Sequence, residues 1–323
     1  MNTELFFSNA GIAFKNLVIL YVIVAIGAFA SKIGWFREEI ARSTSKLLFY
    51  IITPCVIIKA FIGMEYSSET VRNLGIAVAA GFLLHISGIL ISAPFFRGKK
   101  DPDTDAILHY AAVYGNCGYM SLPLAQAMIG EAGVFYCTAV ILTFQVFAFT
   151  HGTMLMEGKN RPLPPDVKKR PLWQCILINA GVVSVAIGLP IFLLRIPVPE
   201  VISTPISYVG SMNTPLAMLM FGSYLSNTKL STVFKTPKLF ITIGIKLIAI
   251  PAVVLAALLA VGAKGALLNA LLISASAPSA NNTVAFAGLY ERGGGYAAQA
   301  VAVVSFLSII SMPLIIAFGL SVA

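Results

Sequence analysis

The sequence predicts an all-α membrane protein with ten transmembrane helices, arranged as two inverted five-helix repeats. Of its residues, 58% are hydrophobic and 11% are charged, which is too little polar surface to coat a soluble globule. Ten stretches have the length of about 20 apolar residues that a membrane helix needs. Short motifs also recur half a chain apart: VAIG at residues 24–27 returns at 185–188, and Thr53-Pro54 returns as Thr214-Pro215. Such an internal duplication is typical of membrane carriers.

The expected spans divide evenly between the two halves of the chain. They cover residues 10–30, 42–62, 73–96, 106–128, 132–155, 172–194, 201–225, 237–261, 265–288 and 295–320. The first stretch is interpreted as a span and not as a cleaved signal. Because five is odd, the second copy enters the membrane from the opposite face, which makes the repeat an inverted one. We therefore expect a first repeat at 1–155, a linker at 156–171 and a second repeat at 172–323.

Basic residues lie mostly on one set of connections, which predicts the orientation. That set holds Lys32, Arg37, Arg42, Arg97, Lys99, Lys100, Lys159, Arg161, Lys168, Lys169, Arg170, Lys229, Lys235, Lys238 and Arg292, and the opposite set holds only Arg72, Arg195 and Lys264. The bias places both termini outside and the linker in the cytoplasm of a prokaryotic cell. The basic residues of these loops explain the net charge of +9, so this charge does not indicate a nucleic-acid partner.

The fourth and ninth spans carry polar residues, glycine and proline where a membrane helix is normally apolar. The segments are YGNCGYMSLP at 114–123 and SASAPSANNT at 274–283. Proline removes a backbone donor, and glycine lowers the cost of leaving helical geometry. Two matched breaks predict crossing half-helices around a binding site whose helix N-termini suit a carboxylate. The candidate site residues are Asn116, Cys117, Gly118, Tyr119, Ser276, Asn281 and Asn282. The alternative is kinks that serve packing alone.

These segments resemble a known family. The pattern G-N-x5-L-P-L at 115–124, with Gln145 in the next span, is similar to the fourth-helix signature of the auxin efflux carrier family, and Pro278 with Tyr290 is similar to its second crossover helix. That family includes plant auxin exporters and bacterial carriers assigned to malate or malonate. The resemblance implies a fold of the sodium/proton antiporter or bile-acid symporter kind, an elevator-like motion, and a substrate carboxylate near Asn116, Pro123 and Pro278. The long hydrophilic loop of plant members is absent, which argues against auxin itself.

The charges inside the spans are few. No Asp or Glu lies centrally in a span, and Glu131 and Glu291 fall in turns, which weakens strong cation coupling. Lys246 lies near the middle of the eighth span, and His85 is its repeat counterpart. We expect Lys246 to act as a fixed cation near the crossing, whereas His85 can also be a satisfied interior histidine. Lys15, Lys46 and Lys59 lie nearer span ends, where snorkelling explains them.

Two further polar kinks are related by the repeat. Thr53-Pro54 interrupts the second span, and Asn213-Thr214-Pro215 interrupts the seventh. They either shape their helices or line the opposite wall of the site. Cys55, Cys117, Cys137 and Cys175 show no metal-ligand spacing, and the three histidines are scattered along the sequence, so we expect free thiols, no metal and no cofactor.

The expected function is secondary transport of a small organic anion by an elevator-like mechanism. The substrate class is a carboxylate such as malate, malonate or an auxin-like acid, with membrane lipids around the protein. Na+ or H+ coupling and a homodimer are left open. The alternatives are a sodium-coupled symporter of the bile-acid type and, from another class, a channel or receptor. No paired carboxylates or nucleophile with a nearby base indicate an enzyme.

Overall fold

Helices make up the regular structure of the chain. The structure, a computed structural model, describes residues 3–97, 101–158, 171, 173–174, 179–226 and 236–322. Within these ranges, the one β pairing is an isolated bridge between Gly115 and Ser279. The expected all-α fold is confirmed. Most of the expected linker at 156–171 lies outside the described residues, as do Cys175, the first two residues and the last.

Six helical stretches in the described part of the chain are long and apolar enough to cross a membrane. They are α1 (Thr3–Lys32), α2–η1–α3 (Glu38–Leu47, Leu48–Ile52 and Thr53–Gly63), α4 (Ser68–Ser92), α7–η3–α8 (Glu131–Phe147, Ala148–Gly152 and Thr153–Glu157), α13–η5–α14 (Pro237–Gly244, Ile245–Ala249 and Ile250–Ala260) and α17 (Gly294–Val322). The protein is therefore built to lie in a membrane.

The other helices are shorter. They are α5 (Pro102–Val113), η2 (Cys117–Ser121), α6 (Leu122–Ile129), α10 (Ala180–Leu193), α11 (Glu200–Ser211), α12 (Asn213–Ser226), α15 (Gly265–Ser276) and α16 (Asn282–Leu289). The gaps between α5 and η2 and between α15 and α16 fall within the two polar segments, so both expected interruptions are confirmed. The arrangement as two inverted five-helix repeats stays a prediction.

Prolines account for two of the π-helical turns in the long helices, whereas η3 lies between α7 and α8, which contain no proline. The π-helical turns η1 and η5 directly precede the turns that contain Pro54 and Pro251. A proline ring clashes with the carbonyl four residues earlier, and a wider turn relieves that clash. Ala277 precedes Pro278 and is extended (φ −57°, ψ 139°), as expected for a residue before proline. The kink at Asn213-Thr214-Pro215 appears as the break between α11 and α12.

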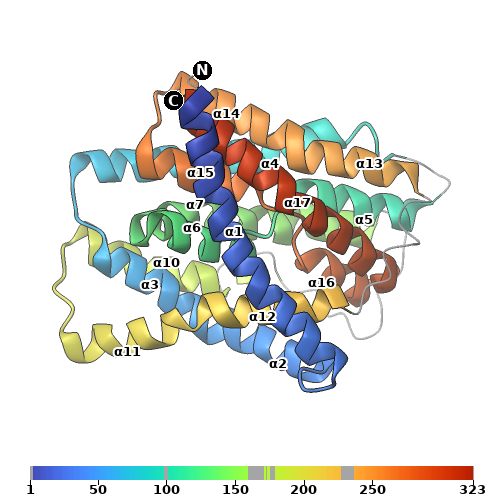
Figure 1. Cartoon of the computed structure of the whole chain (residues 1–323), viewed down its shortest axis with the longest axis horizontal. Helices are drawn as coiled ribbons and strands as arrows, with labels where there is room; N and C mark the ends of the chain where they lie inside the picture. Colours follow the sequence, from blue (N-terminus) through green and yellow to red (C-terminus); the bar gives the residue numbers. More distant parts are fainter. Residues whose placement is uncertain are drawn as a thin grey trace.

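The helices pack as two groups (Figure 1). In the first group, α1 and α2 pack against α12, and α3 packs against α10 and α11. In the second, α4, α6 and α15 pack against α7, α14 packs against both α4 and α15, α5 packs against α4, and α16 packs against α17, which packs against α15. The groups meet where α1 packs against α17 and α3 packs against α7, and this boundary is here called the seam. In Figure 1, α3, α10, α11 and α12 lie below α4, α14 and α15. The stretch Glu131–Glu157 is 72% buried, against 22% for Phe14–Lys32, so the core centres on α7.

Glycine allows the closest helix contact in the first group. A side chain on Gly27 of α1 would collide with the backbone of Leu219 in α12, and one on Gly222 of α12 would collide with the backbone of Val24. Small residues let membrane helices approach in this way. The α1–α12 pair is therefore tightly packed within the first group.

Candidate functional site

The two interrupted segments cross and pair through their backbones. The Asn116 amide donates to the Pro278 carbonyl at 2.7 Å, and the Ala280 amide donates to the Tyr114 carbonyl at 2.9 Å. The Ser279 hydroxyl donates to the Ala111 carbonyl at 2.7 Å. Non-helical backbone survives at membrane depth only where protein or a watery cavity satisfies it. The pairing meets this condition and holds both broken helices together.

Lys246 lies directly at this crossing. A Cβ on Gly115 would lie 2.7 Å from Lys246 Nζ and 3.5 Å from the Ala277 carbonyl oxygen. Lys246 is completely buried, and its ammonium has no hydrogen-bond partner among the described residues. Because α5 ends at Val113 and α15 ends at Ser276, two helix C-termini with partial negative charge face this region. The lysine supplies positive charge where the helix ends leave negative charge.

A cavity of about 60 Å³, here called the crossing cavity, opens beside the pairing. Its lining residues come from both helix groups and are Phe49, Thr53, Gly115, Asn116, Cys117, Gly118, Tyr119, Ile141, Phe144, Gln145, Gly181, Ala280, Asn281 and Asn282. A polar cavity of this size can hold water, and we expect it to have room for a carboxylate group.

Two amide groups in the crossing cavity carry unused donors. Asn116 Oδ1 accepts from the Tyr119 amide at 3.1 Å, which fixes the orientation of the side chain because a backbone amide can only donate. Asn116 Nδ2 is buried with no partner in the described part of the chain, and the same holds for Asn281 Nδ2. The donors come from the two crossing segments and line one cavity.

The crossing cavity brings together most of the residues predicted from the sequence. The predicted residues that line it are Thr53, Asn116, Cys117, Gly118, Tyr119, Gln145, Asn281 and Asn282. Three others lie near the crossing without lining the cavity. The Ser276 hydroxyl donates to the Leu272 carbonyl at 2.6 Å, Pro278 contributes only its carbonyl to the backbone pairing, and Pro123 is buried in the first turn of α6.

Several lining residues carry no sequence signal. Phe49, Ile141 and Phe144 are apolar residues within apolar spans, and nothing in the sequence says which side of a helix faces a cavity. Gly181 is located by a polar chain: Gln145 Oε1 accepts from Asn179 Nδ2 at 3.1 Å, and Asn179 Oδ1 accepts from the Gly181 amide at 2.9 Å. Gln145 thus joins α7 to the start of α10 across the seam.

Asn213 and Thr214 lie away from the crossing cavity. They line a separate cavity of about 210 Å³, here called the second cavity, with Val56, Lys59, Ala60, Leu122, Gln126, Glu131, Gly210 and Ser211. Lys59 Nζ lies 3.1 Å from Glu131 Oε1. Lys59 was expected to snorkel to the membrane surface, but it instead forms an ion pair within the protein.

The histidines, far apart in sequence, gather around Tyr114. Its hydroxyl lies 3.0 Å from His151 Nδ1, and the His109 and His151 rings have centroids 5.4 Å apart. His85 stacks on Phe147 at 5.3 Å, and its Nδ1 bonds to the Gly81 carbonyl. His85 lines neither cavity, so its position favours a packing role. Cys55, Cys117 and Cys137 are free thiols.

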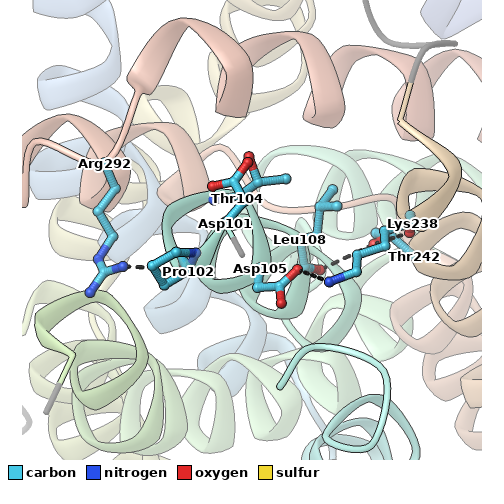
Figure 2. A network of polar contacts seen from close by, with 8 residues as sticks. All are labelled: Asp101, Pro102, Thr104, Asp105, Leu108, Lys238, Thr242 and Arg292. Carbon is cyan, nitrogen blue, oxygen red and sulfur yellow. Dashed lines mark hydrogen bonds and ion pairs between the residues drawn. The ribbon is translucent and has the colours of Figure 1, made fainter. Parts of the chain in front are cut away.

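Polar contacts anchor the start of α5 (Figure 2). Arg292 donates to Asp103 at 2.7 Å and to the Pro102 carbonyl at 3.3 Å, and Lys238 pairs with Asp105. The Asp101 carboxylate caps the helix by accepting from the Thr104 hydroxyl and amide, and these hydrogen bonds lower the pKa of Asp101 below its usual value. The contacts fix the half-helix that delivers Tyr114 and Asn116 to the crossing.

Comparisons with known proteins agree with this architecture. The model of the membrane transport protein family matches residues 12–316. An uncharacterised transporter of Methanocaldococcus jannaschii is 26% identical over 283 residues, which cover 85% of this chain and 88% of that protein. The family match extends over nearly the whole chain and includes both crossing segments. The chain belongs to the membrane transport protein family, the auxin efflux carrier family that its fourth and ninth spans resemble.

Proposed function

We propose that the chain is a secondary carrier of a small organic anion whose carboxylate binds in the crossing cavity. The observation that carries the proposal is the pair of buried donors on Asn116 and Asn281, neither of which has a hydrogen-bond partner among the described residues. A carboxylate has two acceptor oxygens and can take a hydrogen bond from each amide. A buried donor without an acceptor costs about 1–3 kcal/mol, so a bound carboxylate recovers that free energy.

Charge in the surroundings also favours an anion. Lys246 lies against Gly115, a cavity-lining residue, and α16 begins at Asn282 with Asn281 as its N-cap. A helix N-terminus carries partial positive charge. In this role Lys246 is a fixed cation that offsets the C-terminal ends of α5 and α15 and raises the affinity for the negative ligand.

The position of the crossing cavity supports alternating access. Thr53 and Gly181 come from the first helix group, and Asn116, Gln145 and Asn281 come from the second. A carrier must expose its site to each side of the membrane in turn, and a site lined from both groups changes its lining when the groups move along the seam. We propose an elevator-like displacement of the second group within a ten-span inverted repeat, with repeats at 1–155 and 172–323.

A sodium-coupled symporter of the bile-acid type is the alternative carrier. Hydroxyl and amide oxygens of Thr53, Gln145 and Asn282 could hold Na+, but the described lining residues include no Asp or Glu, and carboxylates are common where a carrier binds a cation. A channel or receptor is the alternative of another class. Saturable counterflow distinguishes a carrier from both.

The loop charges support the proposed orientation in the prokaryotic cytoplasmic membrane, with both termini outside. Asn2, Lys168 and Ala323 lie outside the described residues, yet each can be replaced by cysteine in the full chain. We expect an impermeant thiol reagent added to cells to modify the cysteines at 2 and 323 and to spare the one at 168. Termini on opposite faces would remove the five-plus-five scheme.

The function is tested in proteoliposomes. Uptake of radiolabelled malonate and L-malate is measured with and without internal unlabelled acid, in the presence and absence of Na+ and of a pH gradient. A carrier gives saturable uptake that internal acid accelerates, and the ion that drives accumulation identifies the coupling. Flux that rises linearly with concentration would indicate a channel, and no flux of any tested mono- or dicarboxylate would contradict the proposal.

A further inference from the structure

The second cavity continues the seam beyond the crossing cavity. On α3, Thr53 lines the crossing cavity, whereas Val56 and Lys59 line the second. At 1.5 Å per residue, Lys59 is about 9 Å further along the helix than Thr53. The other wall has the same order, because residues 115–119 line the crossing cavity and Leu122 and Gln126 line the second. The two cavities therefore follow one another along α3 and along the first crossing segment with α6.

The second cavity is the roomier of the two. Its volume is about 210 Å³, against about 60 Å³ for the crossing cavity. Polar side chains line it from both helix groups, with Gln126 from α6 and Ser211, Asn213 and Thr214 from the break between α11 and α12. Asn213 is 3% exposed, and its Oδ1 has no partner within the described residues. That oxygen can accept a hydrogen bond from a bound water or a ligand hydroxyl.

An ion pair closes this space across the seam. Lys59 belongs to α3 of the first helix group, and Glu131 is the first residue of α7 in the second. Their side chains are 33% and 39% exposed, and ion pairs with that access to solvent are weak. A side chain on Gly63 would collide with the Glu131 carboxylate, so this glycine leaves the room that the carboxylate needs to reach Lys59.

We propose that the second cavity is a carboxylate subsite on the substrate path, in which a substrate carboxylate replaces Glu131 as the partner of Lys59. The inference rests on the proposed function. When the helix groups move along the seam, α3 and α7 shift relative to each other and the Lys59–Glu131 pair separates. The freed ammonium then binds the substrate carboxylate, and the pair re-forms once the substrate has left. Glu131 is thus both a gate and a competitor for the cation.

The test uses malonate and L-malate uptake by the full chain in proteoliposomes. Lys59→Gln removes the cation, so we expect the KM to rise at least tenfold for substrate supplied from the face where the α6–α7 turn lies. Glu131→Gln removes the competing carboxylate and leaves the cation, so we expect an unchanged or lower KM. A KM that rises in Lys59→Gln and does not rise in Glu131→Gln identifies a subsite, because loss of a merely structural pair affects both variants alike.

Matched variants complete the design. Lys264→Gln changes an exposed lysine that lines neither cavity and should keep the wild-type KM. The double variant Lys59→Glu with Glu131→Lys restores a pair but moves the cation to α7, and we expect its KM to stay high. Equal changes in the two single variants, or full rescue by the double variant, would overturn the subsite while leaving the proposed function intact. Wild-type liposomes without saturable uptake of either acid would overturn both.

Discussion

The two crossing segments make unequal contributions to the cavity they share. The first supplies five consecutive lining residues at 115–119. It continues into η2, whose N-terminus is capped by the Asn116 side chain. The second supplies only 280–282 and passes directly into α16. Its Pro278 and Ser279 are used for pairing with the first segment. We therefore expect the first segment to make the stronger contacts with the ligand and the second mainly to close the backbone around it.

The largest effect is expected from Gly115, where the first segment touches Lys246. A larger side chain at Gly115 must displace the lysine ammonium, whose nitrogen would lie only 2.7 Å from the new Cβ. We expect Gly115→Val to abolish uptake and to lower the thermal midpoint by several degrees, because overpacking costs about 1–3 kcal/mol. Gly118→Ala is the control for the midpoint, since a Cβ there meets no atom within 4 Å. Normal uptake by Gly115→Val would show that the lysine does not need this position.

Charge removal at the crossing should come next in size. Lys246→Met keeps the length of the side chain and removes the charge, so we expect uptake to fall to near background. Lys246→Arg keeps a cation with a different shape and hydration, and an intermediate rate is expected. Both variants are compared in liposomes with equal protein incorporation. A wild-type rate for Lys246→Met would eliminate the fixed-cation role and leave anion selectivity to the crossing segments alone.

Substitution of the two asparagines sharpens the comparison between the segments. We expect Asn116→Ala to weaken carboxylate binding about tenfold or more, which corresponds to about 1.4 kcal/mol, and Asn281→Ala to weaken it less. Asn116→Asp retains the oxygen that caps Tyr119 but replaces the donor with a negative charge, so its loss should be at least as large. Affinity is measured by equilibrium binding of labelled acid. Wild-type affinity in Asn116→Asp would mean that Asn116 only caps the backbone.

The smallest effect is expected from the closing segment. Ser279→Ala removes the hydrogen bond that the Ser279 hydroxyl donates to the carbonyl of Ala111, a buried residue in the last turn of α5. A hydrogen bond of this kind contributes about 1 kcal/mol, so we expect a drop of about 2–4 °C in the thermal midpoint with little change in KM. A change in KM as large as that of Asn116→Ala would show that the second segment also binds the ligand.

The site residues that could be predicted share one property: they are out of place in a membrane helix. Asn116, Asn281 and Gln145 stand in apolar spans, and polar side chains there need a partner or a cavity. Phe144 and Ile141 could not be predicted, since an apolar residue in an apolar span gives no information about the face it occupies. The Lys59–Glu131 pair was also missed, because the packing of α3 beside α7 decides it and no local pattern reports that packing.

The fold, like the site, was predictable only where residues act on their own stretch of backbone. Proline and glycine made both interruptions predictable, because they act on the local backbone. The approach of His151 to both Tyr114 and His109 depends on the tertiary arrangement of α5 and η3. Sequence separation alone had suggested that the histidines are scattered.

Protection of Cys117 tests the central claim most directly. Cys117 lines the crossing cavity beside Asn116, and it can be made the sole cysteine by replacing Cys55, Cys137 and Cys175. The modification rate by a small thiol reagent is measured at increasing concentrations of the transported carboxylate. We expect the rate to fall with half-maximal protection at the dissociation constant of that acid, and the protection to weaken in parallel in Asn116→Ala. Saturating carboxylate that leaves the rate unchanged would place the substrate elsewhere and contradict the account.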